Sequence, residues 1–80
     1  MTIKLSGVRQ VAIAGDYIKL DALLKYASIA STGGEAKMII QSGDVFVSGQ
    51  VCLQRGKKIR SGDVIKIGRG ILIVRQDENK

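Results

Sequence analysis

The apolar residues of this chain change their spacing at Gly43, and this change constrains the fold more than any other feature of the sequence. Before Gly43 the spacing is that of a helix, in which residues three, four and seven positions apart share one face. Asp21, near the start of the first such face, has the charge that a helix N-terminus favours. We therefore predict a short helix that begins near residue 20. Its apolar face consists of Leu20, Leu23, Leu24 and Ala27.

A second helix is predicted between residues 32 and 43. Thr32 and Glu35 have the spacing of a capping box, in which two side chains satisfy free backbone amides at a helix start. Gly43 is typical of a helix end. Neither helix is long enough to be stable alone, so we expect the two to pack as an angled pair. The apolar face of the second helix consists of Ala36, Ile39 and Ile40.

After Gly43 the apolar residues alternate as they do in strands. Segments 45–47 and 50–53 flank Ser48-Gly49 and are predicted to form a hairpin with a two-residue turn. Turns at 61–63 and 68–70 introduce two further strands, at 64–67 and 71–74. Segments 2–5 and 11–14 are weaker strand candidates. The predicted fold class is α+β, with two short packed helices followed by a small, mostly antiparallel β-sheet.

Length and composition exclude several classes of protein. Eighty residues fit one domain, which we expect to span residues 1–76, with a frayed tail at 77–80. Histidine is absent and Cys52 is the single cysteine, which argues against histidine catalysis, a Cys/His zinc site and an internal disulfide. No apolar run is long enough for a signal peptide or a membrane span. We therefore expect a soluble, cytoplasmic protein without a metal or cofactor.

The remaining polar and aromatic residues give no sign of catalysis. Most acids lie at predicted turns and helix starts, where capping explains them, and no histidine is available to activate a Ser or Thr nucleophile. We expect no catalytic residue and no enzymatic activity. Cys52 is interpreted as an apolar filler rather than a reactive thiol. Tyr17, Tyr26 and Phe46 are expected in the core or at its rim rather than stacked on bases.

Positive charge is concentrated in the second half of the chain. The whole chain carries 13 Lys and Arg against 7 Asp and Glu, a net charge of +6. Within residues 45–76 the single acid is Asp63. A solvated loop is the alternative interpretation of the densest cluster, but combined with the overall charge the cluster favours contact with a polyanion. Its four cations are Arg55, Lys57, Lys58 and Arg60.

A second candidate site lies at the start of the second helix. Gly33 and Gly34 leave the first backbone amides uncovered by side chains, and such amides are suited to bind phosphate. Lys37 and Gln41 are four residues apart and lie on the face opposite the apolar residues. The two glycines also permit a tight turn between the helices, and both roles are compatible.

In their order and spacing these segments resemble the RNA-binding domain named after ribosomal small-subunit protein S-four, also called the αL motif. The form Gly-Gly-Glu-Ala-Lys at 33–37, together with the basic cluster, is similar to small stand-alone members of the YaaA-like and YbcJ-like type. Many members have an arginine where this chain has Gly33, so one expected cation is missing. The resemblance covers residues 19–67 and is carried by Lys19-Leu20-Asp21, 32–37, 39–43, 45–49 and 61–64.

The resemblance implies that the two helices and the hairpin form an RNA-docking surface. By position, Lys19 matches the family's arginine on the first helix, Lys37 its arginine on the second, and Ser48-Gly49 its Asn-Gly turn. Combined with the two candidate sites, the expected RNA-binding residues are Lys19, Gly33, Gly34, Lys37, Gln41, Ser48, Arg55, Lys57, Lys58 and Arg60.

We therefore expect a non-enzymatic protein that contacts structured RNA, ribosomal RNA above all, through phosphate and shape recognition. Ribosome assembly and translation quality control are the processes that such a protein would serve, and ribosomal proteins are further candidate partners. Two alternatives stay open. One is a protein-docking module on the ribosome or on another acidic partner, with binding insensitive to salt and ribonuclease. The other is DNA binding, for which the basic pattern of a recognition helix is missing.

Overall fold

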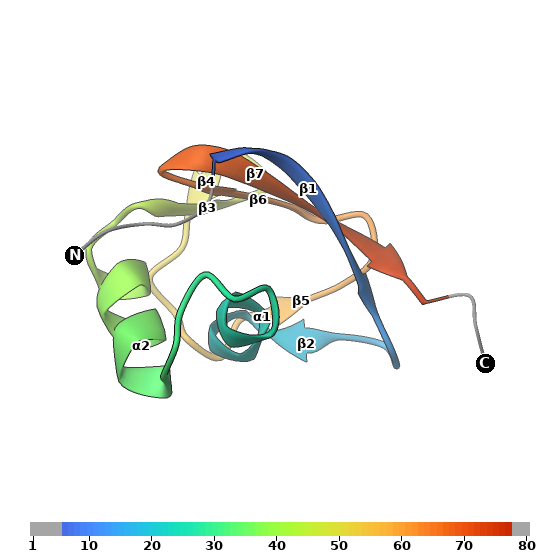
Figure 1. The fold of residues 1–80 in the computed structure, drawn as a ribbon, viewed down its shortest axis with the longest axis horizontal. Coiled ribbons are helices and arrows are strands. Elements are labelled where there is room, and N and C mark those ends of the chain that lie inside the picture. Colours follow the sequence, from blue (N-terminus) through green and yellow to red (C-terminus); the bar gives the residue numbers. More distant parts are fainter. Residues whose placement is uncertain (1–5, 78–80) are drawn as a thin grey trace.

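A computed structural model of the chain describes residues 6–77 and confirms the α+β class. Two helices lie against one face of a five-stranded sheet, and a separate two-stranded sheet lies on the same side (Figure 1). The elements in chain order are β1 (Ser6–Ile13), β2 (Ile18–Lys19), α1 (Leu20–Tyr26), α2 (Gly33–Gln41), β3 (Val45–Val47), β4 (Gln50–Val51), β5 (Lys58–Ile59), β6 (Val64–Ile67) and β7 (Arg69–Gln76).

The predicted order of helices followed by a sheet is incomplete, because β1 and β2 precede the helices. The weak strand candidate at 11–14 belongs to β1, which begins at Ser6 and ends at Ile13. The candidate at 2–5 lies outside the described residues. β1 pairs in parallel with β7, while the other neighbours in the order β1-β7-β6-β3-β4 are antiparallel. The sheet is therefore mostly antiparallel, as predicted, but its edge strand β1 is parallel to its neighbour β7.

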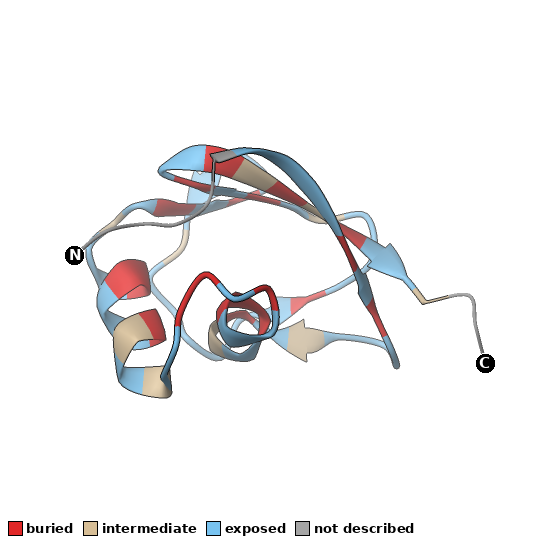
Figure 2. Cartoon of the chain, viewed as in Figure 1, coloured by how far each residue is buried: buried red, intermediate tan, exposed pale blue. Residues whose placement is uncertain are grey.

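Both predicted helices form, with their predicted apolar faces buried. At α2 the Glu35 amide donates to Thr32 Oγ1 at 3.1 Å, which confirms the first bond of the capping box. The Glu35 carboxylate accepts from the amide of Ser31, one residue before the cap, rather than from Thr32. Gly43 has φ +86°, a left-handed conformation that suits glycine at a helix end. The helices pack their buried residues against the inner side of the sheet (Figure 2). The buried residues of the two helical segments are Leu20, Leu23, Leu24, Ala27, Ala36, Ile39 and Ile40.

The predicted hairpin also forms, as β3 and β4. Ser48 and Gly49 have φ +50° and +90°, so both turn residues adopt the positive φ of a type I′ turn. Strand β4 is shorter than predicted and ends at Val51. Strand β7 is longer than predicted: it begins within the expected turn at 68–70 and continues to Gln76. The Asp77 amide then donates to the Ile13 carbonyl at 2.8 Å, which extends the pairing of β7 with β1 by one hydrogen bond.

Candidate nucleic-acid interface

The basic cluster is fixed against the start of α1. The amides of Leu20 and Asp21 donate to the carbonyls of Lys57 and Arg55, at 2.9 and 3.1 Å. These amides are among those that a helix cannot satisfy internally, so the basic segment acts as a cap for α1. The Arg55 guanidinium also lies 3.4 Å from the Asp21 carboxylate. The backbone of the cluster is therefore bonded to the start of α1, while its four cationic residues are exposed.

Lys19 is brought to the basic cluster by the two-stranded sheet. Strands β2 and β5 are antiparallel, with Ile18 opposite Ile59 and Lys19 opposite Lys58. Ile59 is fully buried, whereas both lysines are exposed, so the small sheet anchors its apolar side in the core and presents its cations to solvent. Like charges directly opposite each other are unfavourable in a sheet. This pairing thus concentrates positive charge at a stability cost, as an anion-binding surface requires.

Tyr17 is a residue of this surface that sequence reasoning missed. The ammonium of Lys58 lies 4.9 Å, and the guanidinium carbon of Arg60 5.7 Å, from the centre of the Tyr17 ring. These are cation–π distances. The ring therefore organises two of the predicted cations. The only signal in the sequence was the position of Tyr17 immediately before Ile18 and Lys19, since its partners lie far along the chain.

Of the two places expected for the aromatics, the core and its rim, the structure excludes the core. Tyr17, Tyr26 and Phe46 are 41%, 62% and 37% exposed. The Tyr26 hydroxyl donates to the Ala12 carbonyl at 3.1 Å, which ties α1 to β1. Aliphatic residues alone fill the core, so the aromatics are left for the surface.

The N-terminus of α2 lies beside the basic cluster. A Cβ atom on Gly33 would be 4.0 Å from Nη2 of Arg55. Thr32 receives the amides of Glu35 and Ala36, but the amides of Gly33 and Gly34 have no acceptor within residues 6–77. Two free amides and a guanidinium thus share one corner of the molecule. This arrangement is suited to a phosphate group.

Lys37 and Gln41 are exposed on α2, on the side away from the core. They follow Gly34 at spacings of three and seven residues, so the three residues share one helix face. No contact among the described residues joins Lys37 or Gln41 to the basic cluster. They extend the candidate surface along α2, away from Arg55.

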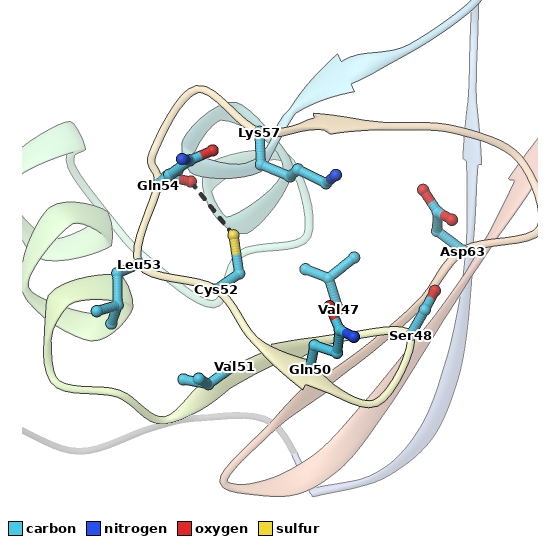
Figure 3. A pocket seen from close by; sticks show the side chains of 9 residues that line it. All are labelled: Val47, Ser48, Gln50, Val51, Cys52, Leu53, Gln54, Lys57 and Asp63. Atoms are coloured by element: carbon cyan, nitrogen blue, oxygen red, sulfur yellow. Dashed lines mark hydrogen bonds between the residues drawn. The ribbon is translucent and has the colours of Figure 1, made fainter.

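A groove of about 700 Å³ separates the hairpin from the basic cluster (Figure 3). Lys57 lies on one side and Ser48 on the other. Cys52 also lines the groove and is partly buried against the core, with its sulfur 3.7 Å from the Gln54 carbonyl. The lining residues are Val47, Ser48, Gln50, Val51, Cys52, Leu53, Gln54, Lys57 and Asp63.

Two acids near this surface are already engaged. Asp21 pairs with Arg55, and the Asp63 carboxylate accepts the backbone amide of Arg60 at 2.8 Å. Lys19, Lys57 and Lys58 have no acidic partner in the described part of the chain. Residues 6–77 contain no group of His, Cys, Asp and Glu arranged to hold a metal, and none of their helices is long and apolar enough to cross a membrane. The surface thus carries exposed positive charge that no acid of the described residues neutralises.

Comparison with known proteins agrees with the resemblance drawn from the sequence. The model of the S4 domain, a non-enzymatic RNA-binding domain, matches residues 11–75. The "Probable ribosome maturation protein RlbA" of Bacillus subtilis (strain 168) is 33% identical to this chain over 57 residues, which cover 71% of this chain and 80% of that protein. Since the family match includes both helices, the hairpin and the basic cluster, the chain belongs to the S4 domain family.

Proposed function

We propose that this protein binds structured ribosomal RNA and acts in ribosome maturation. The observation that carries the proposal is the convergence of cations from separate segments on one surface. Lys19 from β2 meets Lys58 from β5, and Arg55 meets the start of α2. The printed name of the Bacillus subtilis relative supports a role in ribosome maturation. Such a role would place the protein in the cytoplasm.

Recognition would depend on phosphates and shape. Gly33, Gly34 and Arg55 would hold one stretch of RNA backbone, and Lys19, Lys58 and Arg60 an adjacent stretch. Lys57 and Ser48 would contact RNA from the two sides of the groove, and Lys37 and Gln41 along α2. Cations and backbone amides bind phosphate without reading base edges. A-form helices and folded RNA present phosphates in spacings that a rigid surface of this kind distinguishes by shape.

The first test reverses two charges at the centre of the surface. Lys57→Glu combined with Lys58→Glu should weaken binding to a structured ribosomal RNA fragment at least tenfold at low salt and leave the circular dichroism spectrum unchanged. With about five phosphates neutralised, log K of the natural protein should fall with log salt at a slope of roughly −3.5 to −4.5. The double variant should lose roughly 1.4 to 1.8 of that slope, because two phosphate contacts are removed.

The matched control is Lys66→Glu combined with Arg69→Glu, which changes the net charge equally on the other side of the sheet. This control should keep its affinity within about threefold if local contacts dominate over net charge. Equal losses of affinity in the two double variants, or no loss in the first, would contradict the placement of the site.

A DNA counterpart of the fragment, measured at the same salt, should bind more weakly. When the protein is crosslinked to RNA in cells and the bound RNA is sequenced, ribosomal RNA should be recovered. Recovery of other RNAs instead would refute ribosomal RNA as the target.

A further inference from the structure

The outer face of the main sheet is left without a covering layer in the described chain. Helices α1 and α2 and the small sheet all lie on the inner side (Figure 1). Along β7 the residues alternate between buried and half-buried, with Leu72 and Val74 inside and Ile71 and Ile73 outside. The outer side of this strand therefore has two apolar residues at its centre.

A row of four apolar residues, interrupted by Lys66, crosses this outer face from edge to edge. The registers place Val8 of β1 beside Ile71 of β7, Ile71 beside Lys66 of β6, and Lys66 beside Phe46 of β3. Phe46 in turn pairs with Val51 of β4, so one row includes all five strands. Val8, Phe46 and Val51 are 66%, 37% and 53% exposed.

A second pair of apolar residues lies next to this row. Val64 of β6 is opposite Ile73 of β7, and Val64 is 40% exposed. A solvated face of an antiparallel sheet ordinarily alternates to polar residues. Contiguous exposed apolar residues on a small protein are typical of an interaction site. None of these residues belongs to the buried core on the inner side of the sheet.

The charges of the outer face have a single sign. Lys66 lies within the apolar row, while Arg69 and Arg75 lie at the two ends of β7 on the same side. The Arg75 guanidinium lies beside strand β1, since it donates to Gln10 Oε1 at 2.7 Å. By strand alternation no acid faces this side among the described strands.

The apolar residues and the positive charges of the outer face together favour one class of partner. A second copy of the chain would bring Lys66, Arg69 and Arg75 against identical charges, which disfavours self-association. RNA is bound on open sheets by aromatic side chains that stack on bases, whereas this row contains one aromatic among aliphatic residues. We propose that the outer face docks a protein segment whose apolar side chains are flanked by Asp or Glu. The protein would then hold RNA on one side of its sheet and a protein on the other.

The test introduces the photo-crosslinker p-benzoylphenylalanine in place of Phe46 in the full chain expressed in cells. The control carries it in place of Tyr26, an exposed aromatic on α1. Crosslinked peptides are identified by mass spectrometry, then synthesised and titrated against the purified protein. A second probe position, in place of Val51, serves if the first variant does not fold.

The expected result is a crosslink from position 46 or 51, absent from position 26, to a segment with apolar and acidic residues. The synthetic peptide should bind at least fivefold more weakly to Lys66→Glu with Arg69→Glu, and equally well to Lys57→Glu with Lys58→Glu. Crosslinks to RNA alone, to a second copy of the chain, or to a segment whose binding ignores the charge reversal would each overturn the proposal. This outcome is independent of the RNA measurements, because the two surfaces are tested with different ligands and different variants.

Discussion

Lys19 and Lys58 are directly opposed partners in the ladder between β2 and β5, although they come from opposite halves of the sequence. No acid neutralises either lysine in the described structure. A cross-strand pair of like charges lowers stability, whereas an opposite pair raises it by roughly 0.2–1 kcal/mol. The opposed lysines thus separate what is good for the fold from what is good for binding an anion.

The first prediction uses this separation. Lys19→Glu should increase the free energy of unfolding by about 0.5–1 kcal/mol, because it creates an ion pair with Lys58 and places a negative charge at the N-terminus of α1. The same variant should bind RNA at least tenfold more weakly. Urea denaturation and RNA titration measure the two effects.

The control for this prediction is Lys25→Glu, which makes the same change in net charge in the last turn of α1. A negative charge there opposes the helix dipole, so stability should fall by a few tenths of a kcal/mol, roughly, with little change in RNA affinity. If Lys19→Glu loses no more affinity than Lys25→Glu, Lys19 does not contact RNA.

The second prediction concerns the ring of Tyr17. Tyr17→Leu keeps an apolar side chain but removes the ring face on which Lys58 and Arg60 lie. RNA affinity should fall about three- to tenfold, because the two cations are then no longer ordered before RNA binds. Tyr17→Phe should stay within about twofold, because the ring remains. The salt slope should be unchanged in both, since every cation is still present. An equal loss in Tyr17→Phe would instead assign the effect to the hydroxyl.

The third prediction concerns the start of α2. A methyl group on Gly34 would meet only Thr32 Oγ1, at an ordinary 3.9 Å, so Gly34→Ala is sterically allowed. It should raise the free energy of unfolding by up to about 1 kcal/mol, because alanine favours helices more than glycine does. RNA affinity should nevertheless fall several-fold, since the methyl group stands beside amides that would hold a phosphate. Thermal unfolding and RNA titration on one sample give both values, and a parallel rise in stability and affinity would rule out a phosphate at this position.

The helices and the hairpin could be predicted because their signals are local. The capping box of Thr32 and Glu35, and the turn at Ser48 and Gly49, each lie within a few consecutive residues. Strand β1 was predicted only in part, because its inner side carries just two buried apolar residues, Val11 and Ile13, and its stability depends on β7 at the other end of the chain.

The candidate surface also contains residues that could be predicted from the sequence and residues that could not. The cations could be found from composition and from the family resemblance, and the structure then brings Lys19 to Lys58 and Arg55 to Gly33. The role of Tyr17 could not be found, because a cation–π contact between distant segments leaves no pattern in the sequence. The outer face of the sheet was missed for a related reason: it becomes visible only when the registers align Phe46 with Lys66 and Ile71.

The parallel pairing of β1 with β7 has a consequence for how the chain folds during synthesis. Every contact between these strands joins the first described residues to the last, so the loop that must close includes nearly the whole domain. Strand β6 can pair with β3 earlier, but its second neighbour is also β7. The hairpin and the helix pair can form early, but the sheet that supports them is completed only after residue 76 has left the ribosome. A nascent chain that stalls before β7 would thus expose its apolar core until that strand is available for pairing.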